Sequence, residues 1–88
     1  MKVVPCAIPD ILIVEPQVYC DSRGAFLETY NERTFAALGF QHHYVQDNLS
    51  ISKCNVIRGL HYQVRHPQGK LVRAICGEVL DVAVDLRR

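Results

Sequence analysis

A histidine and a lysine that could carry acid-base chemistry lie in the segment between positions 55 and 70, which reads NVIRGLHYQVRHPQGK. The pattern predicts a strand over Val56–Tyr62, a turn at Pro67–Gly69 and a second strand that begins at Lys70. A histidine on a strand can take a proton near neutral pH, and a lysine can stabilise negative charge on a substrate oxygen. On spacing alone, however, His61 is more often a hydrogen-bonded structural residue than a base.

A group of side chains suited to a ligand precedes this segment. A turn is predicted at Asp21–Gly24, followed by a strand over Ala25–Tyr30 in which Phe26, Glu28 and Tyr30 share one face. The same pattern is compatible with two core aromatic residues and a solvated glutamate between them. Both interpretations remain open at the level of the residues.

Another polar face belongs to the strand expected over Tyr44–Ser52, where polar and apolar residues alternate. In a plain sandwich this face is exposed to water, which is the commoner case, whereas in a small barrel it would line a pocket. The residues on this face are Tyr44, Gln46, Asn48 and Ser50.

The remaining elements are mostly strands. Prolines surround the apolar run Ile11–Val14, which predicts a short strand at a sheet edge. Asn31 is expected to cap a helix of about two turns that ends at Gly39. Two strands are expected after position 70, over Leu71–Cys76 and Val79–Leu86, with a turn at Gly77 and Glu78 between them. One face of the last strand is expected to be core and consists of Leu80, Val82, Val84 and Leu86.

This order of elements predicts an all-β sandwich or jelly roll with one short helix. We count about five or six strands, fewer than the eight or so that a jelly roll requires. The sequence contains no repeat, low-complexity tract or linker, so a single partial domain over residues 1–88 without an internal boundary is expected.

Composition limits the classes of partner. The chain is 49% apolar and 22% charged, as in soluble globular proteins, and its net charge of +1 gives no general attraction to nucleic acid or to a membrane. The longest apolar run is too short to span a bilayer and the N-terminus does not resemble a signal peptide, so a cytoplasmic location is expected. The four cysteines have no C-x-x-C spacing and are expected to be free, mostly buried thiols, whereas His42 and His43 are expected at the surface.

Four collinear segments, from about Ile8 to Arg87, resemble the dTDP-4-dehydrorhamnose 3,5-epimerase family. They read AIPDILIVEP, DSRGAFLETYNERTF, VQDNLSISKCNVIRGLHYQ and QGKLVRAICGEVLDVAVDLR. The resemblance implies a cupin-like jelly roll of which this chain is the N-terminal half, because the family's chains are about twice as long. It also implies a homodimeric isomerase without a cofactor that acts on dTDP-4-dehydro-6-deoxy-D-glucose in dTDP-rhamnose biosynthesis.

The resemblance assigns roles to individual residues. His61 matches the base that removes the C3 and C5 protons, and Lys70 matches the lysine that stabilises the enolate. The residues that match substrate-binding positions are Arg23, Phe26, Glu28, Gln46, Asn48 and Arg58. The family's tyrosine acid and the aspartate partner of its histidine match nothing in this sequence, so the chain alone is expected to be inactive.

Two other functions remain open. A related enzyme could invert one centre only or isomerise the ketone, and a non-catalytic module could bind or assemble with nucleotide sugars without chemistry. A metal site is not expected, because the strand around His61 carries a single histidine and no H-x-H pair.

The spacing of Arg58 and His61 determines to which faces of a strand their side chains project. Residues an odd number of positions apart project to opposite faces of a regular strand. Both side chains can therefore reach one pocket only if the strand is distorted, and Gly59 between them is the expected site of a bulge or twist.

Overall fold

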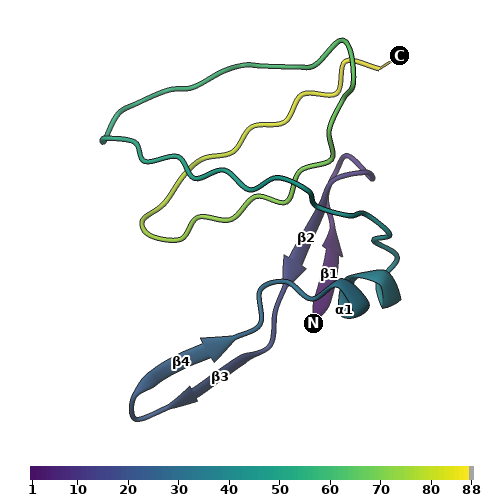
Figure 1. Ribbon diagram of the computed structural model, residues 1–88. Coiled ribbons are helices and arrows are strands. Elements are labelled where there is room, and N and C mark those ends of the chain that lie inside the picture. The colour runs from purple at the N-terminus through teal and green to yellow at the C-terminus, as the bar shows by residue number, and fades with distance from the viewer. Residues whose placement is uncertain (88) are drawn as a thin grey trace. The chain divides into compact units, whose positions relative to one another are not determined.

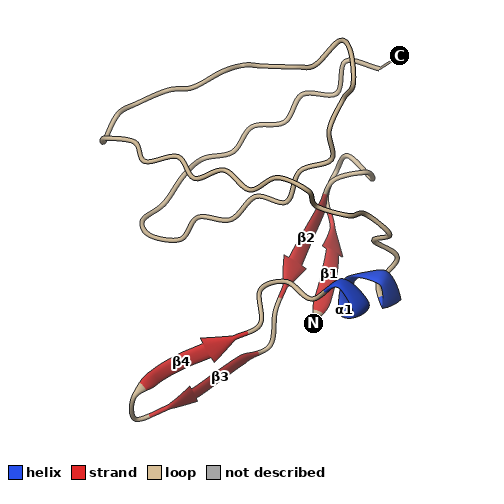
Figure 2. Ribbon diagram, in the orientation of Figure 1, coloured by secondary structure: helices blue, strands red, loops and turns tan. Residues whose placement is uncertain are grey.

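The computed structural model describes residues 1–87, which contain four strands and one short helix (Figures 1 and 2). The strands pair as two separate two-stranded antiparallel sheets. This composition agrees with the expected all-β class and with its single helix. The chain divides into two units, residues 1–43 together with the segment that begins at Ala83, and residues 44–82.

The first hairpin pairs β1, Lys2–Pro5, with β2, Leu12–Glu15. Prolines limit both strands, since Pro5 ends β1 and Pro16 follows β2, and proline cannot donate to a ladder. The expected strand over Ile11–Val14 is thus confirmed, displaced by one residue. The partner strand β1 was not predicted, because its four residues lie too close to the terminus to show a period.

The second hairpin pairs β3, Val18–Asp21, with β4, Gly24–Leu27, so the expected turn between Asp21 and Gly24 is confirmed. β4 ends three residues before the predicted end at Tyr30. The register explains the early end, because Val18 pairs with Leu27 and further residues of β4 would face Gln17 and then Pro16, which lacks an N–H.

Helix α1, Glu32–Ala37, begins and ends as the sequence predicts. The Asn31 side chain accepts hydrogen bonds from the backbone N–H groups of Arg33 and Thr34, at 3.0 and 3.2 Å. At the other end Gly39 has φ +98°, and the Phe40 N–H donates to the Phe35 carbonyl at 2.8 Å. This is a Schellman ending, in which the residue in the left-handed region reverses the chain.

The C-terminal end of helix α1 is also the centre of the small core. Phe35 is 2% exposed and is the one hydrophobic residue that is buried among residues 1–87. Its ring lies 4.9 Å from that of Tyr30, edge to face, and 5.5 Å from that of Phe40. The contact between Phe35 and Phe40 is the hydrophobic contact that accompanies a Schellman motif.

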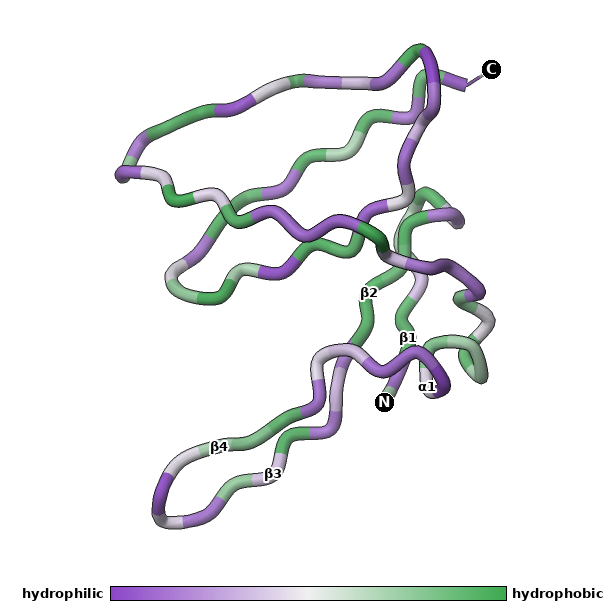
Figure 3. Tube along the Cα trace, viewed as in Figure 1, coloured by the Kyte–Doolittle hydropathy of each residue, from purple (hydrophilic) through white to green (hydrophobic). Residues whose placement is uncertain are grey.

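The segment from 41 to 87 contains no helix or strand, so the strands predicted over 44–52, 56–62, 71–76 and 79–86 are wrong for this structure. The backbone instead runs in extended stretches interrupted at residues 54–55, 64–66 and 75–77, and the alternation of apolar and polar residues remains visible along it (Figure 3). A strand requires interstrand hydrogen bonds as well as the period-two pattern, and these bonds are not formed here. The turn expected at Pro67–Gly69 is likewise replaced by a bend three residues earlier.

Side chains that were expected to be buried are exposed, because the predicted strands form no interstrand hydrogen bonds. The four residues expected to be core are exposed, from Val82 at 56% to Leu80 at 91%. The cysteines are free, but the expectation that they are mostly buried is wrong, since Cys6 is half-buried and the other three are exposed. His42 and His43 are exposed, as expected, and the His43 Nδ1 lies 2.9 Å from the Glu32 carboxylate.

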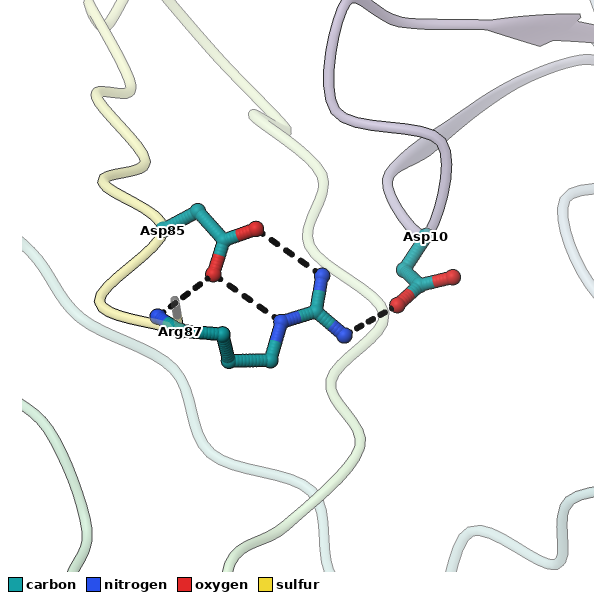
Figure 4. Close-up of polar contacts among 3 residues, drawn as sticks. All are labelled: Asp10, Asp85 and Arg87. Carbon is teal, nitrogen blue, oxygen red and sulfur yellow. Dashed lines mark hydrogen bonds and ion pairs between the residues drawn. The ribbon is translucent and has the colours of Figure 1, made fainter.

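A charge cluster ties the last described residues to the loop of the first hairpin within the first unit (Figure 4). The Arg87 guanidinium donates to both carboxylate oxygens of Asp85, each at 2.9 Å, and to Asp10 at 2.6 Å. The paired guanidinium lowers the pKa of Asp85 to about 2. The three side chains are exposed or nearly so, so water and salt screen the attraction.

Replacing Gly39 by alanine is expected to weaken the helix ending, because φ +98° is strained for a residue with a Cβ. If the strain destabilises the helix ending by about 1 kcal/mol, protection of the Phe40 amide against hydrogen exchange should fall roughly five-fold. Gly69→Ala is the matched control, since Gly69 has no positive φ and open space around its Cα. Equal Phe40 protection in both variants would contradict this account of the helix ending.

Candidate functional site

The β3–β4 hairpin carries two of the predicted site residues, Phe26 on β4 and Arg23 in the turn. Cross-strand partners in an antiparallel pair project to the same side, so the pairing of Tyr19 with Phe26 places both rings on one face of the hairpin. Asp21 lies two residues after Tyr19 and shares this face. Its cross-strand partner Gly24 has no side chain, and the space where a Cβ would stand is open.

Asp21 holds Arg23 in place. The Arg23 backbone N–H donates to one carboxylate oxygen of Asp21 at 2.8 Å, and the guanidinium Nε and Nη2 donate to the other at 3.1 and 2.5 Å. These bonds lower the pKa of Asp21 from its ordinary value and raise that of Arg23. Nη1 makes no hydrogen bond, so it is available for an anion.

A shallow hollow of about 490 Å³ lies along this part of the hairpin. Arg23 and Phe26 both line it, so the structure brings these two predicted residues together. Tyr19 and Asp21 also line it, and the sequence analysis assigned neither of them. Their signal was the hairpin register, which follows from the two-residue loop between Asp21 and Gly24 once β3 is recognised as a strand.

Glu28 lies one residue beyond the end of β4 and does not line the hollow. Its carboxylate accepts a hydrogen bond from the Asn31 side-chain amide at 3.3 Å. Glu28 is therefore linked to the cap of helix α1 and not to Arg23.

In the second unit, Gln46 and Asn48 lie together. The Gln46 side-chain amide donates to the Asn48 side-chain oxygen at 3.3 Å, which agrees with the prediction that these alternate residues share a face. Both side chains are exposed. Two adjacent amides can donate and accept hydrogen bonds from a polar ligand.

The predicted bulge at Gly59 is not tested, because the strand in which it was expected does not form. Gly59 has φ +117°, outside the range of a regular strand, and residues 56–62 do not form one. The Arg58 guanidinium donates to the Ser52 hydroxyl at 3.0 Å. No hydrogen bond joins Arg58 to His61.

His61 and Lys70 are exposed, and within residues 1–87 neither has a hydrogen bond or an ion pair. Between them the Gln63 and Gln68 side chains close the bend, with the Gln68 N–H donating to Gln63 at 2.8 Å. The structure thus pairs Arg23 with Phe26 and Gln46 with Asn48, and leaves His61, Lys70, Arg58 and Glu28 separate.

Among the described residues, no three histidine, cysteine or acidic side chains gather as a group of metal ligands. The same part of the chain has no helix with the length and hydropathy that crossing a bilayer demands.

The pKa of Asp21 should depend on Arg23. Removing the guanidinium in Arg23→Ala is expected to return the Asp21 pKa towards its ordinary value of 3.8, as measured by NMR of the carboxyl carbon. Because the folded pKa is depressed, the pairing stabilises the hairpin above the unfolded pKa, and the stabilisation is lost as pH falls through the lower folded value. Asp85 is the internal control and should stay near 2 in both proteins. An unchanged Asp21 pKa would show that Arg23 does not pair with it in solution.

Comparison with known proteins gives a consistent family. The sequence profile of dTDP-4-dehydrorhamnose 3,5-epimerase matches residues 5–88. Proteins of that name are 58% identical in Pseudomonas aeruginosa and 57% identical in Salmonella typhimurium, in each case over 100% of this chain and 49% of the relative. A third, from Methanothermobacter thermautotrophicus, is 51% identical over 99% of this chain and 47% of its own length.

The chain spans about half the length of these curated relatives. No solved structure matches it. The agreement of the family profile with several relatives over almost every residue is nevertheless sufficient: the chain belongs to the dTDP-4-dehydrorhamnose 3,5-epimerase family.

Proposed function

We propose that this chain is the N-terminal half of an isomerase that inverts C3 and C5 of dTDP-4-dehydro-6-deoxy-D-glucose, a step of dTDP-rhamnose biosynthesis. The observation that carries the proposal is the family match over residues 5–88, which includes the segment with His61 and the segment with Lys70.

The substrate's chemistry explains why these residue types serve. The C4 ketone acidifies the protons on C3 and C5, and the imidazole of His61 removes each proton in turn. The electrons of the broken C–H bond pass to the C4 oxygen as an enolate, which the Lys70 ammonium stabilises. A proton then returns to the same carbon from the opposite face and inverts the centre. No metal or cofactor takes part.

The substrate's nucleotide and sugar would be held by the remaining site residues. Arg23 offers the free end of its guanidinium to phosphate, and Phe26 offers a ring face to the base. Arg58 binds the diphosphate or the sugar. Glu28, Gln46 and Asn48 complete the set of polar contacts, for which their exposed side chains are suited.

The fold of the complete protein would be a cupin-like jelly roll in which residues 1–88 form one partial domain. The extended segment from 44 to 86 keeps the alternating pattern of strands, and its exposed apolar side chains would pack once the rest of the sheet is present. We expect a cytoplasmic homodimer that binds a dTDP-sugar and neither nucleic acid nor membrane. The 88-residue chain alone lacks a residue that matches the family's tyrosine acid, so it would not turn over substrate.

The proposal is tested by exchange of substrate protons for deuterium, followed by NMR. A protein in which this chain is joined to the second half of the family's fold should exchange the protons at both C3 and C5. His61→Asn should slow exchange by about 10² to 10⁴-fold, the usual contribution of a general base. His43→Asn is the matched control, because His43 is an exposed histidine with no match to the family's site.

Each failure has a separate meaning. Exchange at one carbon only would indicate a single-centre epimerase or a ketoisomerase. Binding of the nucleotide sugar without exchange at either carbon would indicate a non-catalytic module. Undiminished exchange in His61→Asn would remove His61 from the mechanism.

A further inference from the structure

We propose that Tyr19 is a further nucleotide-binding residue, which forms with Phe26 a two-ring surface for the nucleobase. The inference rests on the proposed function, since it extends the nucleotide part of that site. It comes from the register of the β3–β4 hairpin, in which Tyr19 is the cross-strand partner of Phe26.

The two rings are arranged to receive a planar group. Tyr19 is 63% exposed and Phe26 is 73% exposed, although both are large apolar side chains on one face of a sheet. Within the described residues neither ring contacts the other or a third ring. Aromatic faces that are open in this way stack well on bases, whose π-faces they can cover.

The charge beside the rings fits the rest of a nucleotide. Asp21 lies on the same face as Tyr19, and it orients Arg23 at the end of the hollow that Tyr19 and Phe26 also line. Alternate residues of a strand are about 6.8 Å apart, so Asp21, which holds the guanidinium, lies about that far along the strand from Tyr19. Gly24, opposite Asp21, leaves this space free of a side chain.

The other face of the hairpin is of a different kind. It carries the cross-strand pairs Val18 with Leu27 and Cys20 with Ala25, which are aliphatic or small. Such a face is suited to packing against protein. The division of the hairpin into an aliphatic face and a face with two rings and one arginine favours a nucleotide as the occupant of the second.

The test separates the base from the phosphates by using three probes on the 88-residue chain. Binding of thymidine, dTDP and inorganic pyrophosphate is measured by NMR titration for the unmodified chain and for its variants. Tyr19→Ala should weaken the binding of thymidine and of dTDP by the same factor, about five-fold or more, because one stacked ring is lost. The binding of pyrophosphate should stay unchanged. Tyr19→Phe keeps the ring and should stay within about two-fold of the unmodified chain.

Three further variants, Arg23→Ala, Phe26→Ala and Val18→Ala, distinguish this inference from the function on which it rests. Arg23→Ala should weaken the binding of dTDP and of pyrophosphate but not that of thymidine. Val18→Ala, on the other face of β3, should leave the binding of all three probes unchanged. If Arg23→Ala and Phe26→Ala weaken dTDP while Tyr19→Ala does not, the nucleotide site stands and the role of Tyr19 is refuted. If the unmodified chain binds neither dTDP nor thymidine, both the proposed nucleotide site and the role of Tyr19 are refuted, and the two rings are then left as a surface for protein.

Discussion

Pairing of backbone hydrogen bonds between strands is the constraint on which this structure depends. An extended segment becomes a strand only when a neighbour accepts and donates in register, and a lone two-stranded hairpin is at best marginally stable. The first unit meets the requirement locally, because tight connections bring β1 to β2 and β3 to β4. The segment from 44 to 86 has the alternating sequence of strands but forms no ladder.

Local order and local chemistry coincide as a result. Where a hairpin fixes the register, the side chains have defined partners, as Asp21 has with Arg23. Where the chain is extended and unpaired, the proposed base His61 and the proposed enolate-stabilising Lys70 have no such partner and lie exposed. Catalysis depends on groups held within a fraction of an ångström of the reacting atoms. The proposed nucleotide contacts could thus be organised by the hairpin itself, whereas the proposed base needs further structure to hold it.

Sequence reasoning succeeded where the determinants are local. The cap at Asn31, the helix ending at Gly39 and the turn between Asp21 and Gly24 each depend on a few adjacent residues, and all three are present. It failed for the strands after position 44, because period-two alternation predicts which face a residue would take but not whether a partner strand exists. For the same reason Leu80 was assigned to a core that these residues do not form.

The site was predictable to the same degree. Arg23 and Phe26 meet because they belong to one hairpin, and Gln46 meets Asn48 because alternate residues share a side. Tyr19 was missed because β3 is four residues long and its pattern becomes visible only beside β4.

Hydrogen exchange tests most directly the claim that the extended segment from 44 to 86 forms strands only when partner strands are present. We predict that backbone amides of Val45, Leu49, Leu80 and Val84 exchange at the rate of an unfolded peptide in the 88-residue chain. The same amides should be protected by several orders of magnitude when the chain is joined to the second half of the family's fold. Strong protection of these amides in the 88-residue chain at concentrations where it is a monomer would contradict the account, because it would show that the segment forms its ladders without a partner.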